Sequence, residues 1–552
     1  QTASDSRSRV AWVSGPSGIG KSILLREAVA RIRQSGSPLV AAGKCDEGTR
    51  GQPYAILVQA LEQLLQFVLG CPEEEFATWQ DRIRAATTAV DRTLAGFLPA
   101  LPVVLFAQPA ATETPDASAV LERERVRQGM ARLLACFATA TRPLVLLLGD
   151  LQWADVGALE VLERLLHQHA GTPLLLVGTF RSNEVDADHP LRADRLAEVP
   201  ASVKLELGPL DERALRELIA QALQQDADGL GPLTDVVGRK TQRNPFFTQH
   251  LLGLLAHDGL LSYDAGASAW RWSLERITAH PAVDNVVDLL VRRFEELPAP
   301  TQSALQLLAF LGQRASGETL AVAAGLAPDA RSIRSLEATL EPAFRAGTLC
   351  REDDDWVFCH DRFREATYAS VAPADRASLH LQIARRQSAH PTARAHVFAI
   401  AAQANLARSA VDALQERRDF AKLNLEAGRQ AKAATAHHSA LGFFRAALDF
   451  LGADDVTEEG LNARASCGEA EFLTGNLEAA EARLSALEQV AGDGVFGADL
   501  ARLRAALYTT LGRFDLALAV GLSFLRKAGI HVPMRPDDAA VDREYTQLRT
   551  WL

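Results

Sequence analysis

A chain of 552 residues is long enough for three or four domains at roughly 150 residues each. Its composition, 48% hydrophobic and 23% charged, is that of a globular protein, and no apolar run approaches the roughly 18 residues that a membrane span needs. The net charge of −11 is spread without a block of Lys or Arg, which argues against broad electrostatic binding to nucleic acid. We therefore expect a multidomain protein with no membrane partner and no nucleic-acid partner.

The six cysteines are scattered along the chain, without a CxxC pair or the Cys/His spacing of a zinc site. This pattern argues against a disulfide framework and predicts a reducing, cytoplasmic location. The excess of Arg over Lys and the abundance of Ala predict a bacterial source. Because residue 1 is Gln and no signal pattern follows it, we expect the chain to be a piece of a longer protein.

Short apolar runs alternate with helical stretches in the first part of the chain. The first run with strand character lies at residues 10–13. The later runs lie at residues 37–46, 142–150, 172–182 and 203–210. Continuous apolar strands between amphipathic helices indicate a parallel sheet covered on both faces. The predicted fold class is therefore α/β for residues 1–210.

The sequence GPSGIGKS at residues 15–22 lies between an apolar strand and an amphipathic helix, which is the order that a P-loop requires. Its glycines let backbone N–H groups surround phosphate oxygens, Lys21 places a charge on the β- and γ-phosphates, and Ser22 can bind Mg²⁺. We predict a P-loop NTPase domain whose ATP/ADP-binding residues are Gly15, Pro16, Ser17, Gly18, Ile19, Gly20, Lys21, Ser22 and Ile23.

Two polar residues follow later strands of the same sheet. Asp150 ends an apolar run, so its carboxylate should face the crevice at the carboxyl ends of the strands and hold Mg²⁺ together with Ser22. A helix N-cap is the alternative role. Arg181 follows the next strand, where its guanidinium could sense the γ-phosphate, and a surface arginine is the alternative. With Lys21, these two residues form the predicted catalytic set.

After residue 210 the strand signal nearly disappears. Helical stretches and a short β-like stretch at Trp270–Trp272 predict a helical domain over residues 211–285. Within it, Pro245 in RNPFF turns the chain after a helix, and packing alone would explain the two phenylalanines that follow.

A helix predicted over residues 283–297, two further helices, two strands and a last helix resemble a winged helix over residues 286–372. His360 and Asp361 open that last helix. A lone histidine is usually structural, and contact with the nucleotide is the alternative.

From residue 373 to residue 552 the pattern is helical throughout. Small and aromatic residues recur at a period of roughly 37 to 40 residues, which predicts degenerate tetratricopeptide (TPR)-like repeats forming an α-solenoid, with an ordinary helix bundle as the alternative. The recurring residues are Gly428, Ala440, Phe444, Ala447, Gly468, Ala480, Ala505 and Ala517.

Together these motifs resemble the STAND class of signalling ATPases (signal transduction ATPases with numerous domains), and within it the ATPase module of large bacterial hybrid kinases. The segments that carry the resemblance, in order, are GPSGIGKS, GDLQWAD, FRSNEVDADHPL, RNPFF, FCHDRFREATY and ERRDFAKLNLEAGRQAKAATAHHSAL. The resemblance covers essentially the whole chain, and the kinase parts of such proteins lie outside it.

The resemblance implies a nucleotide switch that is closed with ADP and opened by ATP together with a signal. In related switches, a proline in the helical domain lies near the adenine, and a His-Asp pair in the winged helix contacts the β-phosphate of ADP. Pro245 and the pair His360 and Asp361 stand at matching places. The TPR-like helices would bind a protein partner or signal, and we also expect a nucleotide-dependent homo-oligomer.

One residue departs from the family pattern. The family usually has two acids before LQWAD, and here the first of them is Gly149. We therefore expect nucleotide binding with slow ATP hydrolysis. A protein-interaction scaffold with a vestigial nucleotide site is one alternative, which Gly149 favours. The regulatory part of a transcriptional regulator is another, although Glu318, Glu337 and Glu341 stand among the arginines of the predicted winged helix.

Overall fold

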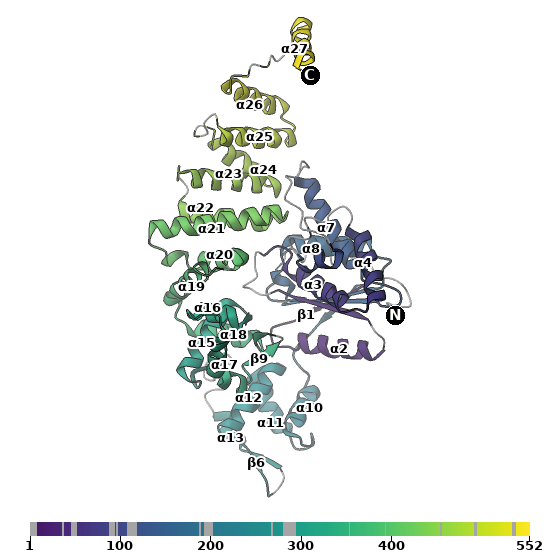
Figure 1. Cartoon of the computed structure of the whole chain (residues 1–552). Helices are drawn as coiled ribbons and strands as arrows, with labels where there is room; N and C mark the ends of the chain where they lie inside the picture. The colour runs from purple at the N-terminus through teal and green to yellow at the C-terminus, as the bar shows by residue number, and fades with distance from the viewer. Residues whose placement is uncertain are drawn as a thin grey trace. The chain divides into compact units, whose positions relative to one another are not determined.

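The computed structural model describes the chain from residue 8 to residue 551, except for residues 36–37, 46–51, 88–93, 95–97, 107–118, 187–188, 192–201, 267–268, 280–293, 353, 392, 453–454, 489, 491–493, 531 and 533–536 (Figure 1). Its internal contacts divide it into two compact units. The first unit is Gln1–Asp412 with Ala433–Ala436, and the second is Ala413–Lys432 with His437–Leu552. Because this division does not separate the first three predicted domains, the four predicted domains stay predictions.

The first unit contains a five-stranded parallel sheet in the order β2-β3-β4-β1-β5. The strands are β1 (Arg9–Ser14), β2 (Leu39–Lys44), β3 (Leu144–Gly149), β4 (Leu174–Phe180) and β5 (Ser202–Glu206). Strands β1 to β4 lie in apolar runs of the sequence, because a strand covered on both faces needs apolar side chains on both. The edge strand β5 is largely exposed, and its apolar residues alternate with polar ones. The predicted α/β fold of P-loop type is confirmed.

Helices cover the sheet on both faces. On one face, buried side chains of α3, α7 and α8 form a single core with those of the strands, and α2 lies on the other face (Figure 1). The helices of this part are α2 (Lys21–Ser35), α3 (Ala55–Leu69), α4 (Glu73–Thr87), α6 (Ala100–Leu105), α7 (Ala119–Cys136) and α8 (Val156–Gln168).

The strand order determines which loops meet at the carboxyl edge of the sheet. Since β4 lies between β1 and β3, and β2 lies beyond β3, the loops after these four strands follow one another along that edge. In parallel sheets this edge is where ligands bind. The P-loop follows β1, Arg181 follows β4, Asp150 follows β3, and Lys44 is the last residue of β2.

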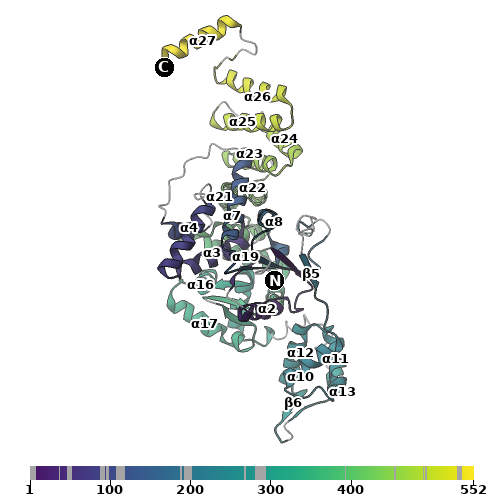
Figure 2. The ribbon, with the colours of Figure 1, turned by 90° about the vertical axis from the view of Figure 1, so that its right-hand side faces the viewer.

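The next part of the first unit is a helical bundle from which a two-stranded hairpin projects (Figure 2). Leucine, isoleucine and valine side chains from its helices form a separate core. Its elements are α10 (Glu212–Leu223), α11 (Gly231–Thr241), α12 (Pro245–His257), β6 (Leu261–Asp264), β7 (Ala269–Trp272) and α13 (Leu274–Ala279). The strand predicted at Trp270–Trp272 is therefore present.

A third core lies between residues 294 and 366, around Trp356 and Phe358. Its elements are α15 (Ala299–Leu311), β8 (Arg314–Ser316), α16 (Gly317–Ala324), α17 (Ala330–Arg345), β9 (Leu349–Glu352), β10 (Asp355–Phe358) and α18 (Asp361–Ser370). The three strands pair antiparallel in the order β8-β10-β9. The two predicted strands and the helix after them are present, and the name winged helix stays a prediction. Most of the helix predicted over residues 283–297 lies outside the described residues.

The first unit continues with two more helices, and the second unit contains only helices among its described elements. They are α19 (Pro373–Ser388), α20 (Val397–Leu406), α21 (Leu414–Ala433), α22 (His437–Leu451), α23 (Glu458–Leu473), α24 (Leu477–Ala486), α25 (Val495–Thr510), α26 (Phe514–Lys527) and α27 (Asp538–Trp551). A Cβ atom at residue 428 would lie 2.3 Å from the ring of Phe444, and one at residue 468 would lie 2.7 Å from Leu484. The recurring glycines therefore mark close approaches between helices, while their identity as TPR-like repeats stays a prediction.

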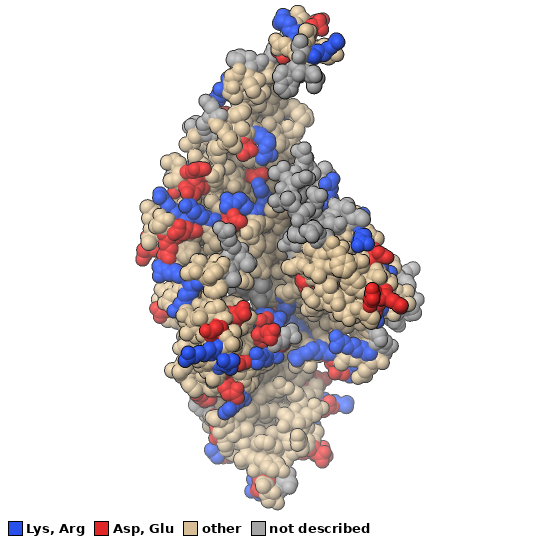
Figure 3. Space-filling view, in the orientation of Figure 1, with Lys and Arg blue, Asp and Glu red and all other residues tan. Residues whose placement is uncertain are grey.

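The surface carries both signs of charge. On the face drawn in Figure 3, Lys and Arg side chains stand beside Asp and Glu over much of the surface. This mixture agrees with the scattered charges of the sequence. None of the described helices is both long enough and apolar enough to cross a membrane.

Candidate functional site

The glycine loop between β1 and α2 is held close to the start of α12. Gly18 has a φ of +81°, which L side chains rarely adopt. A Cβ atom there would lie 3.1 Å from both the side-chain oxygen of Asn244 and the Cβ of Phe246. Glycine is therefore required at residue 18 both by the backbone conformation and by the neighbouring helix.

The side chain of Lys21 folds back over this loop. Its Nζ donates hydrogen bonds to the carbonyl oxygens of Gly15, at 2.8 Å, and Pro16, at 3.0 Å. Burial lowers the pKa of Lys21, although the nearby Asp150 carboxylate raises it. Since an ammonium group has three N–H donors, one donor is left beyond the two carbonyl bonds.

The loop fits a phosphate-bearing ligand. The Oγ of Ser17 is buried without a hydrogen-bond partner among the described residues, which is costly unless a ligand or water satisfies it. Ser22 is exposed in the first turn of α2, where the helix N-terminus favours an anion. Oxygen ligands suit Mg²⁺, so the Ser22 hydroxyl and the Asp150 carboxylate are the groups that would hold it.

Asp150 stands in a strained conformation at the end of β3. Its φ of 54° is left-handed, which is rare for a residue with a side chain and is often found at functional sites. Its Oδ2 lies 3.3 Å from the Nζ of Lys44, and its Oδ1 accepts a hydrogen bond of 3.4 Å from Gln152. Asp150 is the N-cap residue of the short 3-10 helix at Leu151–Trp153, the alternative role, but its side chain makes no capping bond.

Arg181 is buried and surrounded by acids. Its side chain is 5% exposed, and its guanidinium lies over the ring of Trp153, so the alternative of a surface arginine is wrong. Nη2 donates to Asp361 at 2.8 Å, and Nη1 donates to Glu184 at 2.6 Å and to Glu365 at 2.9 Å. Burial lowers the pKa of Arg181, but these carboxylates outweigh it and raise the pKa above its ordinary value.

Asp361, the first residue of α18, lies between two cations that belong to the sheet. Its Oδ2 accepts from Arg181, and its Oδ1 lies 3.3 Å from the Nζ of Lys44. Burial alone would raise the pKa of this carboxyl group, but Lys44 and Arg181 hold it well below its usual range. The charges therefore alternate along the edge of the sheet, from Asp150 through Lys44 and Asp361 to Arg181.

His360 acts as a helix cap and a stacking partner. Its Nδ1 accepts a hydrogen bond of 3.1 Å from the backbone N–H of Arg362 at the start of α18. Its ring stacks on Phe246, with centroids 3.8 Å apart. Burial lowers the pKa of His360 to about 4, helped by the charges of Lys44 and Arg181, so the imidazole is neutral near pH 7.

The start of α12 is tied to the P-loop. Pro245, predicted to turn the chain after a helix, is the first residue of α12. Asn244 caps the helix by accepting from the backbone N–H groups of Phe246 and Phe247, and its Nδ2 donates to the carbonyl oxygen of Ser17 at 3.1 Å. Phe246, predicted to be core packing, also lies against Phe363. The bundle thus contacts both the P-loop and the segment that carries His360.

Sequence reasoning did not find Lys44, Asn244 or Glu365. Lys44 lies near the end of the run predicted as a strand at residues 37–46, the same kind of place that drew attention to Asp150 and Arg181. Asn244 had a local signal as well, because Asn directly before Pro is typical of a helix start. Glu365 had no such signal, since only the fold brings it to Arg181. The structure brings the P-loop, Asp150 and Arg181 to one edge of the sheet, and nucleotide contact by these residues, by Pro245 and by His360 stays a prediction.

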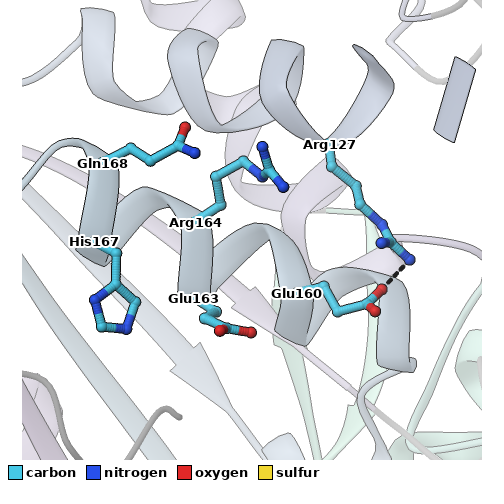
Figure 4. Close-up of a pocket in the computed structure, with 6 residues that line it drawn as sticks. All are labelled: Arg127, Glu160, Glu163, Arg164, His167 and Gln168. Carbon is cyan, nitrogen blue, oxygen red and sulfur yellow. Dashed lines mark ion pairs between the residues drawn. The ribbon is translucent and has the colours of Figure 1, made fainter. Parts of the chain in front are cut away.

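A separate pocket of about 450 Å³ lies between α7 and α8 (Figure 4). Arg127 comes from α7 and forms an ion pair with Glu160 of α8. The other lining residues are Glu163, Arg164, His167 and Gln168. None of the predicted site residues lines this pocket, and its mixed charges do not favour a phosphate.

One family model matches the first part of the chain. Residues 1–177 match the model of the AAA ATPase domain. Among curated proteins, the chain is 22% identical over 670 residues to the hybrid signal transduction histidine kinase G of Dictyostelium discoideum. That match covers 98% of this chain and 19% of the relative, so the chain spans about a fifth of its length.

Solved structures resemble the chain only distantly. A STAND protein with a tetratricopeptide repeat sensor from Pyrococcus horikoshii has a TM-score of 0.39 and 11% identity, over 96% of this chain and 76% of that one. A Walker-type ATPase of Pyrococcus abyssi has a TM-score of 0.28 and 14% identity, over 65% of this chain and 90% of that one. The domain match and the curated relative confirm the resemblance to P-loop ATPases of signalling proteins, while the bacterial source stays a prediction.

Proposed function

This chain contains an AAA ATPase domain and is related to signal-transduction proteins, and from that premise we propose that it is a regulatory switch that binds ATP and ADP. In this proposal, ADP holds the closed arrangement, which we define by the ion pairs of Asp361 with Lys44 and Arg181. ATP, together with a partner or signal bound by the TPR-like helices, opens it. A nucleotide-dependent homo-oligomer belongs to the same proposal.

The position of Asp361 is the observation that carries the proposal. Its carboxylate is on α18, yet both of its cationic partners lie at the carboxyl edge of the sheet, where the P-loop begins. A phosphate group placed at this edge and the Asp361 carboxylate would be attracted by the same cations. Two anions that compete for one cation weaken each other's binding to it. A γ-phosphate that binds Arg181 would therefore weaken the ion pair between Arg181 and Asp361, and with it the closed arrangement.

Slow hydrolysis of ATP is the chemistry that these residues support. The loop amides and Lys21 would hold the phosphates and stabilise the charge that develops on them. Asp150 would orient the attacking water or hold Mg²⁺, which supplies charge neutralisation when it is bound. With Gly149 in place of the first acid and Arg181 engaged by three carboxylates, turnover is slow while the arrangement is closed.

The first experiment quantifies the nucleotide that the purified protein releases when it is denatured. We expect ADP in roughly stoichiometric amount from the wild type, and its loss from Lys21→Ala, because the ammonium is the charge nearest to the bound phosphates. Lys204→Ala is the matched control, since Lys204 is an exposed lysine of β5. Equal ADP content in Lys21→Ala and the wild type would contradict the site assignment.

A second experiment separates a switch from a scaffold with a vestigial site, which Gly149 favours. Limited proteolysis is compared with saturating ADP and with a non-hydrolysable ATP analogue. A switch gives two different patterns, because only a ligand with different affinities for two states can shift their populations. One pattern for both nucleotides would support the scaffold.

A further inference from the structure

Gly149, where the family that the chain resembles usually has an acid, leaves space that Lys44 fills. Lys44 and Gly149 are register partners on the neighbouring strands β2 and β3. A Cβ atom at residue 149 would lie 3.3 Å from the Cγ of Lys44 and 3.7 Å from its Cβ. The first of these distances is tighter than an ordinary contact, so the aliphatic part of Lys44 packs over the glycine more closely than a side chain there would permit.

From this position the ammonium group of Lys44 reaches two carboxylates. Its Nζ lies 3.3 Å from Asp150 and 3.3 Å from Asp361, and its side chain is 45% exposed. Burial lowers the pKa of Lys44, but the two carboxylates outweigh it and raise the pKa, so the side chain is charged. Lys44 thus connects the carboxylate assigned to Mg²⁺ with the carboxylate that defines the closed arrangement.

We propose that Lys44 competes with a divalent cation for Asp150 and thereby couples cation binding to the opening of the closed arrangement. This inference rests on the proposed function, because it assumes that nucleotide and Mg²⁺ bind at the P-loop. A cation held by Asp150 repels the Lys44 ammonium, and a displaced ammonium loses its bond to Asp361 as well. Cation binding therefore weakens one of the two ion pairs that hold Asp361.

The coupling must act in both directions. If the cation weakens the closed arrangement, the closed arrangement weakens binding of the cation by the same factor, since the two equilibria are linked. An acid at residue 149 would add a second ligand oxygen but would crowd Lys44. With glycine at residue 149, the site has no second carboxylate for Mg²⁺, and the Lys44 ammonium lies beside Asp150 instead. In this proposal, both features lower the affinity of the closed form for Mg²⁺.

The test measures Mg²⁺ dependence directly, with fluorescently labelled ADP bound to the whole chain. We measure the rate at which labelled ADP dissociates as a function of Mg²⁺ concentration, for the wild type, Lys44→Met and Lys44→Gln. The quantity compared is the Mg²⁺ concentration at which half of the full change in this rate is reached. Both substitutions remove the charge and keep a stem that packs over Gly149. We expect this concentration to fall about fivefold, as for the loss of one partly exposed ion pair, and to stay unchanged in Lys204→Met.

The possible outcomes distinguish this inference from the function on which it rests. If labelled ADP binds but the Mg²⁺ dependence is the same in the wild type and both Lys44 variants, the inference is wrong and the proposed function stands. If the wild type binds no labelled ADP with or without Mg²⁺, the proposed function itself fails. Circular dichroism identifies a variant that does not fold, and the other Lys44 substitution then carries the test.

Discussion

Each of the two compact units contains a carboxylate held between two cations, and the two arrangements differ in how far apart their partners lie along the chain. In the first unit, Asp361 pairs with Lys44 and Arg181. In the second, Glu471 of α23 pairs with Arg445 of α22 at 3.2 Å and with Arg483 of α24 at 2.8 Å. The Glu471 side chain is 0% exposed and that of Asp361 is 17% exposed.

The sequence separations decide what each cluster can do. The partners of Glu471 are 26 and 12 residues away, on adjoining helices of one array. The partners of Asp361 are 317 and 180 residues away, at the edge of the sheet. A cluster of near neighbours stabilises local packing, whereas ion pairs between distant segments stabilise one arrangement of those segments and are lost when they separate.

The largest expected change in a rate is the faster release of nucleotide from Asp361→Asn. The amide keeps the shape of the side chain but loses both ion pairs, so we expect ADP to dissociate about tenfold faster, which corresponds to about 1.4 kcal/mol. Stopped-flow measurement with labelled ADP checks this rate. Glu471→Gln is the control, for which we expect no change in the dissociation rate of ADP. If ADP dissociated equally faster from both variants, the Asp361 cluster would have no special role in holding the nucleotide.

The converse expectation concerns the stability of the second unit. Glu471→Gln leaves Arg445 and Arg483 without a counter-charge, but these side chains are 52% and 30% exposed, so water compensates part of the loss. We expect the free energy of unfolding of this unit to fall by about 2 kcal/mol, below the usual cost of breaking a fully buried pair. Calorimetry of the whole chain measures it, and no change would mean that the cluster adds nothing to packing.

A smaller effect is expected where α12 meets the P-loop. Asn244→Ala removes the helix cap and the bond to Ser17, which should cost about 1 kcal/mol of stability and weaken binding of labelled ADP. Asn244→Ser keeps a capping oxygen but loses the amide donor, so it separates the two roles. If Asn244→Ser binds ADP as the wild type does, the bond to Ser17 does not support the nucleotide site.

A pH dependence of stability is expected from His360 in the first unit. Because the pKa of His360 is lowered to about 4, the unfolded chain binds a proton below about pH 6.5 that the folded chain does not, so stability falls as the pH drops from about 6.5 towards 4. Comparing the wild type with His360→Gln by thermal melting at about pH 7 and about pH 5 isolates this contribution. An identical loss of stability in the two proteins would contradict it.

The fold of the first unit could be predicted because its signals are local. Strands β1 to β4 coincide with apolar runs, and Pro245 and His360 stand at helix starts where their neighbours already indicate a turn or a cap. The glycine loop was recognisable in the same way, since its spacing is a property of eight consecutive residues. Asn244 and Lys44 carried usable signals too, but nothing in their neighbourhoods indicates their partners.

The sequence by itself determined the α/β sheet, the phosphate-binding loop and the carboxylate at the end of β3, because apolar periodicity and loop geometry depend on residues close together in the chain. Only the tertiary structure decided that Lys44 fills the space at Gly149 and joins Asp150 to Asp361, and that Arg181 is held by acids of α18. These contacts join residues more than a hundred positions apart along the chain. They depend on strand order and on how the segments pack, and no pattern of neighbouring residues records either of these.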